Sequence, residues 1–353
     1  MKKFGIYLHW PFCLSKCPYC DFYSKPSSCF DEKILKAAYL RDIEQLPDYP
    51  QLTSFFFGGG TPSLMSPSLI ESILKKVSDK FHFSPDIEIS LEANPETLTP
   101  EKIKAFRDTG INRLSLGVQA LNKKDLRFLG RIHSLQTALT CIDNVARIFD
   151  NFSLDLIYAR PNQTLDEWIK ELDTALSFQA PHYSFYQLTI EEGTAFARKG
   201  IKEADEELAR QMYLNTLDKM EKANIPLYEV SNFARKGFQS KHNLLYWQGD
   251  DYAGIGPAAH GRLGLLATEN PTDIDLWLKG KKETTLLSEK ERFEEKVLMG
   301  TRLADGIKAN GIPLKNIQKA CRMKWITFDG ESIKPTREGL LMQNQLSLIL
   351  LSD

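Results

Sequence analysis

The chain has 353 residues, and at about 150 residues per domain this length predicts about two domains, although a single barrel can use about 250 residues. Lys plus Arg total 45 against 46 Asp plus Glu, so no excess of cations is present to hold a polyphosphate, and we expect no nucleic-acid partner. Hydrophobic residues make up 42 % and charged residues 26 %, a composition that excludes a disordered chain.

The first two-thirds of the chain alternate short β-rich runs with amphipathic stretches, a pattern typical of a parallel sheet built from βα units. Six strands are predicted, at residues 4–8, 53–57, 87–92, 113–116, 152–157 and 183–188. Helices are predicted between and after them, at residues 32–45, 67–80, 100–108, 135–149, 165–178 and 203–222. The fold class is therefore α/β, and periodicity does not decide between a doubly wound sheet and a closed or partly open barrel.

The last third of the chain loses this regular alternation. A seventh strand is predicted at 226–231, before a loop-rich segment that contains His242 and Trp247. Helices are predicted at 290–303 and after Thr336, in a stretch rich in Lys and Glu. We therefore expect three parts: a core at 1–235, a loop-rich segment at 236–269 and a small, mostly helical C-terminal domain at 270–353.

Features of the whole sequence point to the cytoplasm. No stretch approaches the ~18 consecutive apolar residues of a membrane-spanning helix. The apolar run near the N-terminus is short and is broken by His9 and Pro11, so we expect no secretion signal. The six cysteines are too few for a disulfide scaffold, which fits a reducing compartment.

Three cysteines, Cys13, Cys17 and Cys20, follow the first predicted strand with C-x-x-x-C-x-x-C spacing. Three thiolates can hold three irons of a four-iron cluster and leave the fourth iron open to a small molecule. A structural zinc site would need a fourth ligand, and a redox-active Cys17–Cys20 pair would leave Cys13 unexplained. The spacing favours the iron–sulfur site, and both alternatives stay open. The remaining cysteines are interpreted as buried or surface thiols with no role in the metal site: Cys29, Cys141 and Cys321.

Five blocks extend this signal along the chain: residues 7–13 (YLHWPFC), 57–63 (FGGGTPS), 91–95 (LEANP), 114–119 (LSLGVQ) and 129–131 (LGR). With these blocks and the three cysteines, the chain resembles the radical S-adenosylmethionine (SAM) superfamily. It resembles in particular the oxygen-independent coproporphyrinogen III oxidase family of that superfamily. The resemblance implies a partial (β/α)6 TIM-like barrel that carries a 4Fe-4S cluster on the three cysteines, with SAM as a second cofactor.

The resemblance also implies ligand-binding roles for other residues. It assigns the amino and carboxylate end of SAM to Gly59, Gly60 and Thr61, and the ribose to Glu92. Further residues that it places at SAM or in the pocket are Tyr7, Tyr19, Gln119, Arg131 and Asp155. From the residues alone, glycines let a backbone approach a ligand and expose its amide groups. Turn glycines, a core tyrosine and an Arg131–Asp155 salt bridge are the structural alternatives, and binding of a second SAM stays open.

Three features favour the heme-chaperone branch of this family over the oxidases. The oxidase pattern has a further cysteine where this chain has Phe22, and an N-terminal extension where only three residues precede the first predicted strand. The H-N-x-x-Y-W segment resembles a heme-binding signature of the chaperones, and it supplies His242, Asn243, Tyr246 and Trp247. An imidazole can ligate heme iron and aromatic rings can pack on the macrocycle. His260 is a rival ligand, and a hydrogen-bonded core histidine is the structural alternative for His242.

The resemblance therefore implies a chaperone that takes heme as cargo and passes it to a recipient hemoprotein of the respiratory chain. The alternative is a radical SAM enzyme acting on a porphyrinogen, so enzymatic activity stays open. Peripheral contact with a membrane through a respiratory partner, and a homodimer, are also left open. Residues 158–164 read YARPNQT where the family usually reads YGLPGQT, which we interpret as loop drift.

Overall fold

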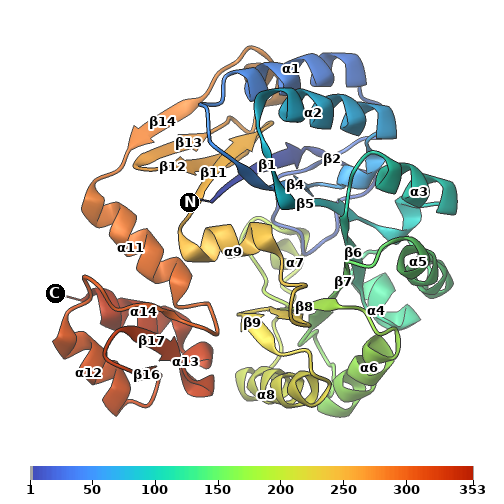
Figure 1. The fold of residues 1–353 in the computed structure, drawn as a ribbon. Helices are drawn as coiled ribbons and strands as arrows, with labels where there is room; N and C mark the ends of the chain where they lie inside the picture. The colour runs from blue at the N-terminus through green and yellow to red at the C-terminus, as the bar shows by residue number, and fades with distance from the viewer. Residues whose placement is uncertain (1–2, 353) are drawn as a thin grey trace.

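The structure is a computed structural model that describes residues 3–352, and within this range it contains one twelve-stranded sheet. The strand order is β14-β13-β12-β11-β1-β4-β5-β6-β7-β8-β10-β9, and the end strands β14 and β9 do not pair with each other in the described range. The sheet curves into a partly open barrel (Figure 1). Its seven consecutive parallel strands are β11 (Asp251–Ile255), β1 (Phe4–Trp10), β4 (Leu52–Gly59), β5 (Phe83–Ala93), β6 (Arg113–Gln119), β7 (Phe152–Tyr158) and β8 (His182–Gln187).

The six predicted strands and their helices are confirmed. The helices that cover the convex face of the sheet are α1 (Glu32–Glu44), α2 (Pro67–Lys80), α3 (Pro100–Asp108), α5 (Leu135–Ile148), α6 (Leu165–Ser177) and α8 (Glu206–Lys222). Helix α3 shows why they begin where they do: the Thr99 side chain accepts from the Lys102 amide, and Pro100 takes the first helical position. Side chains on the buried sides of these helices, such as Tyr39, Phe106 and Trp168, are fully buried. The partial barrel expected from the sequence is therefore present.

The loop-rich description of residues 236–269 is wrong. This segment contains helix α9 (Lys241–Gln248) and strand β11, which pairs in parallel with β1 on the side opposite β4. The strands were not predicted because glycines, which are atypical of strand interiors, interrupt the pattern. In the structure the glycines allow very close packing: a Cβ on Gly254 would lie 2.2 Å from the carbonyl oxygen of His260. The antiparallel strands that continue this edge are β12 (His260–Leu263), β13 (Leu266–Glu269) and β14 (Glu283–Leu286).

The predicted seventh strand at 226–231 contains β9 (Leu227–Glu229), which pairs antiparallel with β10 (Asn232–Ala234) at the other edge of the sheet. Helix α9 lies inside the curve of the sheet, against β1, β4 and β11 (Figure 1). Ser240 caps its N-terminus, and Gly249 ends it with a φ of 66°.

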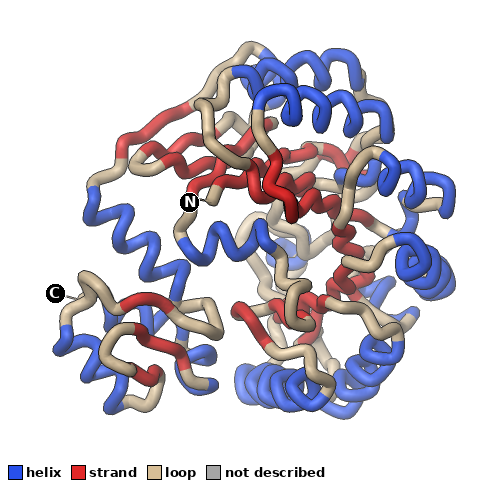
Figure 2. The backbone as a smooth tube through the Cα atoms, viewed as in Figure 1, coloured by secondary structure: helices blue, strands red, loops and turns tan. Residues whose placement is uncertain are grey.

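The C-terminal part packs around a core of its own that includes Val297, Ile317, Leu346 and Leu350. Its helices surround a small sheet, as Figure 2 shows. The elements from residue 270 onward, apart from β14, are α10 (Ile274–Leu278), α11 (Glu289–Gly300), β15 (Ile307–Lys308), α12 (Leu314–Arg322), β16 (Ile326–Phe328), β17 (Ser332–Pro335), α13 (Arg337–Leu341) and α14 (Gln343–Leu351). The helical content is as expected, and the division into parts at residues 236 and 270 stays a prediction. Within residues 3–352, no helix is both long and apolar enough to cross a bilayer.

Candidate functional site

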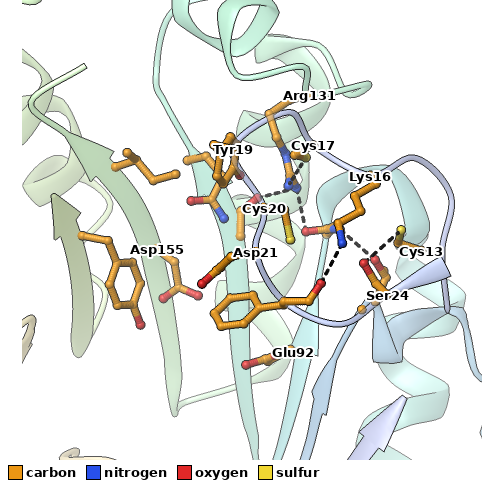
Figure 3. A pocket seen from close by; sticks show the side chains of 18 of the residues that line it. Cys13, Lys16, Cys17, Tyr19, Cys20, Asp21, Ser24, Glu92, Arg131 and Asp155 are labelled. Atoms are coloured by element: carbon orange, nitrogen blue, oxygen red, sulfur yellow. Dashed lines mark hydrogen bonds between the residues drawn. The ribbon is translucent and has the colours of Figure 1, made fainter. Parts of the chain in front are cut away.

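The cysteine loop leaves the C-terminal end of β1 and brings its three thiols to one cavity (Figure 3). Two short parallel strands, β2 (Phe12–Cys13) and β3 (Lys25–Pro26), hold the two ends of the loop together. The Ser27 amide adds a 2.9 Å hydrogen bond to the Cys13 carbonyl. Cys13, Cys17 and Cys20 form no disulfide, and all three line the cavity, whose volume is about 420 Å³.

The donor set fits a cluster better than a single ion. Within residues 3–352, no three Cys, His, Asp or Glu side chains converge closely enough to hold one metal ion. A four-iron cluster needs no such convergence, because each thiolate binds a different iron. A structural zinc ion takes four protein ligands, and this loop supplies three cysteines. Burial raises the pKa of the Cys13 and Cys20 thiols, so metal binding must displace their protons.

The glycine loop that follows β4 packs directly on the start of the cysteine loop. Gly59 has a φ of 112°, and a Cβ on it would lie 2.7 Å from the Trp10 carbonyl oxygen. The Gly60 amide donates to that same carbonyl at 2.7 Å, and the Thr61 amide donates to the Phe12 carbonyl at 2.8 Å. The expectation of exposed glycine amides is therefore wrong for Gly60, and the Gly59 amide also has a partner, the Glu92 carboxylate. The glycines are needed here because two backbones approach each other closely.

Two carboxylates face the cavity from neighbouring parts of the sheet. Glu92, near the end of β5, accepts a 3.1 Å hydrogen bond from the Gly59 amide, and burial together with the nearby Asp155 raises its pKa to about 8. Asp155 on β7 accepts from the hydroxyls of Ser115 at 2.8 Å and Ser153 at 3.1 Å. Burial also raises the pKa of Asp155. Paired acceptors of this kind suit a ligand rich in hydroxyl groups.

The remaining predicted pocket residues differ in position. Tyr19, Gln119 and Arg131 line the cavity. Gln119 ends β6 with a φ of 69°, a strained conformation for a residue that is not glycine. Tyr7 is not among the lining residues; its hydroxyl shares a 3.1 Å hydrogen bond with Nδ1 of His9. Arg131 does not pair with Asp155, because its Nη2 donates to Asn94 Oδ1 at 2.6 Å and its Nη1 lies 3.5 Å from Cys17 Sγ.

The four residues of the H-N-x-x-Y-W segment lie on α9, which packs near the N-terminal ends of β1 and β4, whereas the cysteines follow the C-terminal end of β1. His242 is almost fully buried, and its Nδ1 bonds Ser54 Oγ at 2.8 Å while its Nε2 bonds the Tyr246 hydroxyl at 2.7 Å. Burial lowers its pKa to about 3, so the ring is neutral near pH 7. The backbone amide of Asn243 donates to the side-chain hydroxyl of Ser240, which caps the helix. The Arg302 guanidinium lies 5.8 Å from the centre of the Trp247 ring. Both nitrogens of His242 thus have partners within the protein.

Several lining residues were not predicted. These are chiefly Phe22, Asn94, Ser115, Gly117 and Tyr186. Two of them, Asn94 and Gly117, stand two positions from a predicted residue on the same strand or at its end, so strand alternation could have found them. The interpretation of residues 158–164 as loop drift is also wrong for Arg160. This side chain is buried and forms ion pairs with Glu171 and, at 3.0 Å, with Asp125.

Comparison with known proteins places this geometry in a family. Residues 7–175 match the model of the Radical SAM superfamily. A Bacillus subtilis protein named heme chaperone HemW is 34 % identical over 97 % of this chain and 97 % of its own. The zebrafish (Danio rerio) mitochondrial radical S-adenosyl methionine domain-containing protein 1 is 33 % identical over 98 % of this chain and 87 % of its own.

A solved structure, the coproporphyrinogen III oxidase HemN from Escherichia coli, covers 99 % of this chain and 90 % of its own with a TM-score of 0.83. At 18 % identity that likeness establishes the fold alone. The full-length relatives carry the assignment further. The chain belongs to the radical SAM superfamily, in the family of the HemW proteins.

Proposed function

We propose that this protein is a heme chaperone that binds heme and transfers it to a recipient hemoprotein of the respiratory chain. The observation that carries the proposal is the 34 % identity, along nearly the whole of both chains, with a protein named heme chaperone HemW. Phe22 supports it, because this exposed side chain stands at the cavity where the oxidase pattern has a further cysteine.

The chain carries a 4Fe-4S cluster on Cys13, Cys17 and Cys20 in this proposal, with SAM beside it. When bound, the cluster supplies an open iron for the amino and carboxylate groups of SAM and a source of one electron. The chain's own residues orient the ligand: Gly59, Gly60 and Thr61 shape the loop beside the cysteines. Glu92 and Asp155 are placed to accept hydrogen bonds from hydroxyl groups, with Tyr19, Gln119 and Arg131 around them.

Replacing Cys13, Cys17 or Cys20 individually with Ala is expected to abolish the visible absorbance of the cluster after anaerobic reconstitution, since three thiolates are the minimum set here. Cys29→Ala is the matched control, because Cys29 is an exposed thiol a few residues downstream. Iron and sulfide analysis of the four variants checks the result. Full cluster content in all three site variants would overturn the cluster assignment.

Access favours His260 over His242 as the heme ligand. The His260 side chain is about half exposed, and its nearest acidic neighbour, Glu269, lies 3.8 Å away. His242 is almost fully buried and would have to give up the hydrogen bond of whichever nitrogen bound the iron. We therefore propose His260 as the axial ligand. We propose that Asn243, Tyr246 and Trp247 contribute to heme binding through helix α9, which also carries His242.

Heme titration of the reconstituted protein, followed by its Soret band, tests the function. We expect saturation near one heme per chain, weaker binding for His260→Ala, and transfer of bound heme to an apo-hemoprotein. Weakening by His242→Ala with unchanged thermal unfolding would overturn the choice of ligand. Absence of saturable binding would overturn the chaperone, and release of 5′-deoxyadenosine with porphyrinogen turnover would establish the radical enzyme instead.

A further inference from the structure

Arg131 reaches the cysteine loop because of the residue before it. Gly130 ends the turn after α4 (Lys123–Phe128) with a φ of 66°, and a Cβ there would lie 2.5 Å from Pro18 Cδ. Only a glycine lets this turn lie directly on Pro18, which adjoins Cys17. The close contact brings the next side chain, Arg131, to the Cys17 thiol (Figure 3).

The guanidinium of Arg131 contacts the thiol and the sheet at the same time. Nη1 lies 3.5 Å from Cys17 Sγ, while Nη2 donates to Asn94 Oδ1 at 2.6 Å and to the Gly117 carbonyl at 3.1 Å. The guanidinium is planar and rigid, so the contacts of Nη2 fix the direction of Nη1. Asn94 and Gly117 thereby aim one N–H group at the sulfur.

Asn94 extends this contact to the glycine loop. Its Nδ2 donates to Thr61 Oγ1 at 3.2 Å, and its backbone amide donates to Ser63 Oγ at 3.3 Å. One continuous series of hydrogen bonds therefore runs from the loop of Thr61 through Asn94 and Arg131 to Cys17. It connects the two segments that the family resemblance assigns to SAM and to the cluster.

The charge of Arg131 is directed mainly at the thiol. No carboxylate forms an ion pair with Arg131 within the described residues; the nearby Glu96 is bound to His133 at 2.9 Å instead. Its other close ionisable neighbours are Tyr19 and Cys17. A cation that no carboxylate neutralises acts most strongly on the thiolate that it touches.

We propose that Arg131 is a positioning residue that raises the reduction potential of the cluster through Cys17 and couples that potential to occupancy of the glycine loop. A hydrogen bond to a cluster sulfur stabilises the reduced cluster, which carries one more negative charge. A ligand that fixes Thr61 also fixes Asn94 and Arg131, so ligand binding and cluster reduction affect each other reciprocally. The inference rests on the cluster of the proposed function and is independent of heme transfer.

A redox titration of the reconstituted full-length protein, followed by electron paramagnetic resonance with and without SAM, tests this coupling. Arg131→Met is expected to lower the midpoint potential, and Arg131→Lys to lower it less. Asn94→Ala is expected to lower it by disordering the guanidinium, with no additional effect in the Arg131→Met background. The shift in potential caused by SAM is expected to shrink in Arg131→Met and in Asn94→Ala.

Arg127→Met is the matched control, because Arg127 is an exposed cation on the neighbouring helix α4 and does not line the cavity. A midpoint potential in Arg131→Met equal to that of the parent would overturn the proposal. Equal effects of the Arg127 and Arg131 variants would overturn it as well. If Arg131→Met loads no cluster, Arg131→Lys and Asn94→Ala supply the same comparison. Failure of heme binding alone would leave this result standing, whereas cluster retention in the cysteine variants would remove its basis.

Discussion

Two residues after β7 adopt left-handed backbone conformations at positions where the family pattern has glycine. Ala159 has a φ of 54° and Asn162 a φ of 62°. Asparagine tolerates this region, but the Cβ of alanine approaches a carbonyl oxygen and costs about 1 kcal/mol. The Ala159 side chain is also buried, so the strain persists in the folded protein.

Ala159→Gly is expected to raise the free energy of unfolding by about 0.5 kcal/mol, because relief of this strain exceeds the added freedom of the unfolded chain. Urea unfolding monitored by circular dichroism measures the change. Asn162→Gly is the matched comparison and should alter stability less. A destabilised Ala159→Gly variant would show that the alanine methyl contributes more by packing than it costs by strain.

At this scale the sequence could locate residues at the ends of strands, but not their partners. The cysteines, the glycine loop and Glu92 lie at one cavity because parallel strands end on the same side of a sheet. The structural alternative for Arg131, an ion pair with Asp155, is not formed, since Arg131 contacts Asn94 instead and the spacing is equally compatible with both partners. Arg160 was missed because its partners, Asp125 and Glu171, are distant in sequence and nothing in the loop indicates a buried cation.

Among the elements, α9 depends on a buried carboxylate from the sheet. Glu88 on β5 accepts hydrogen bonds from the backbone amides of Lys241 and His242, each at 3.2 Å, and from the Ser240 hydroxyl at 3.4 Å. These amides belong to the first turn of the helix and have no partner within it. A negative charge at this end also interacts favourably with the helix dipole.

Glu88→Gln is expected to lower the free energy of unfolding by about 2 kcal/mol, because the amide keeps the shape but loses the charge and one acceptor. Chemical denaturation of the variant and the parent measures this loss. Asp86→Asn is the matched control: Asp86 also pairs with Lys241, but it is exposed and should matter little. Equal stability of Glu88→Gln and the parent would mean that Ser240 alone caps the helix.

Helix α9 and strand β11 could not be predicted from periodicity. The helix has only eight residues, and both its inward face and much of its outward face carry aromatic or apolar side chains, so no amphipathic pattern results. The strand contains Gly254 and follows a helix-ending glycine, which is typical of a loop. The longer helices were predictable because each buries one of its sides against the sheet and exposes its opposite side to solvent.

The whole molecule buries acids and bases whose titrations oppose each other. Burial raises the pKa of Glu229 to about 7 and that of Glu92 to about 8, and lowers the pKa of His9 to about 4 and that of His242 to about 3. A raised carboxyl pKa stabilises the folded state at low pH, and this stabilisation is lost as the pH rises from about 4.5 toward 8. A lowered histidine pKa costs stability as the pH falls below about 6.5.

Thermal and urea unfolding are therefore expected to show maximal stability of the cluster-free chain between about pH 5 and pH 6.5. Glu229→Gln is expected to reduce the loss of stability between pH 5 and pH 8 by about 2 kcal/mol. Glu229 is fully buried where β9 meets residue 303 and lies outside the cysteine cavity, so binding at that cavity should not change. If the variant lost as much stability between pH 5 and pH 8 as the parent, Glu229 would be ionised in the folded state throughout this range.

The pairing of β1 with β11 also has a consequence for synthesis on the ribosome. β1 ends at Trp10, but its neighbour on one side does not begin until Asp251. At about 5–20 residues per second, translation of the intervening chain takes about 10–50 s. Throughout that interval the nascent strand that leads into the cysteines has one unpaired edge, and its thiols are held only by the segments made so far. Metal delivery to the growing chain would thus compete with oxidation and with edge-to-edge association between neighbouring nascent chains.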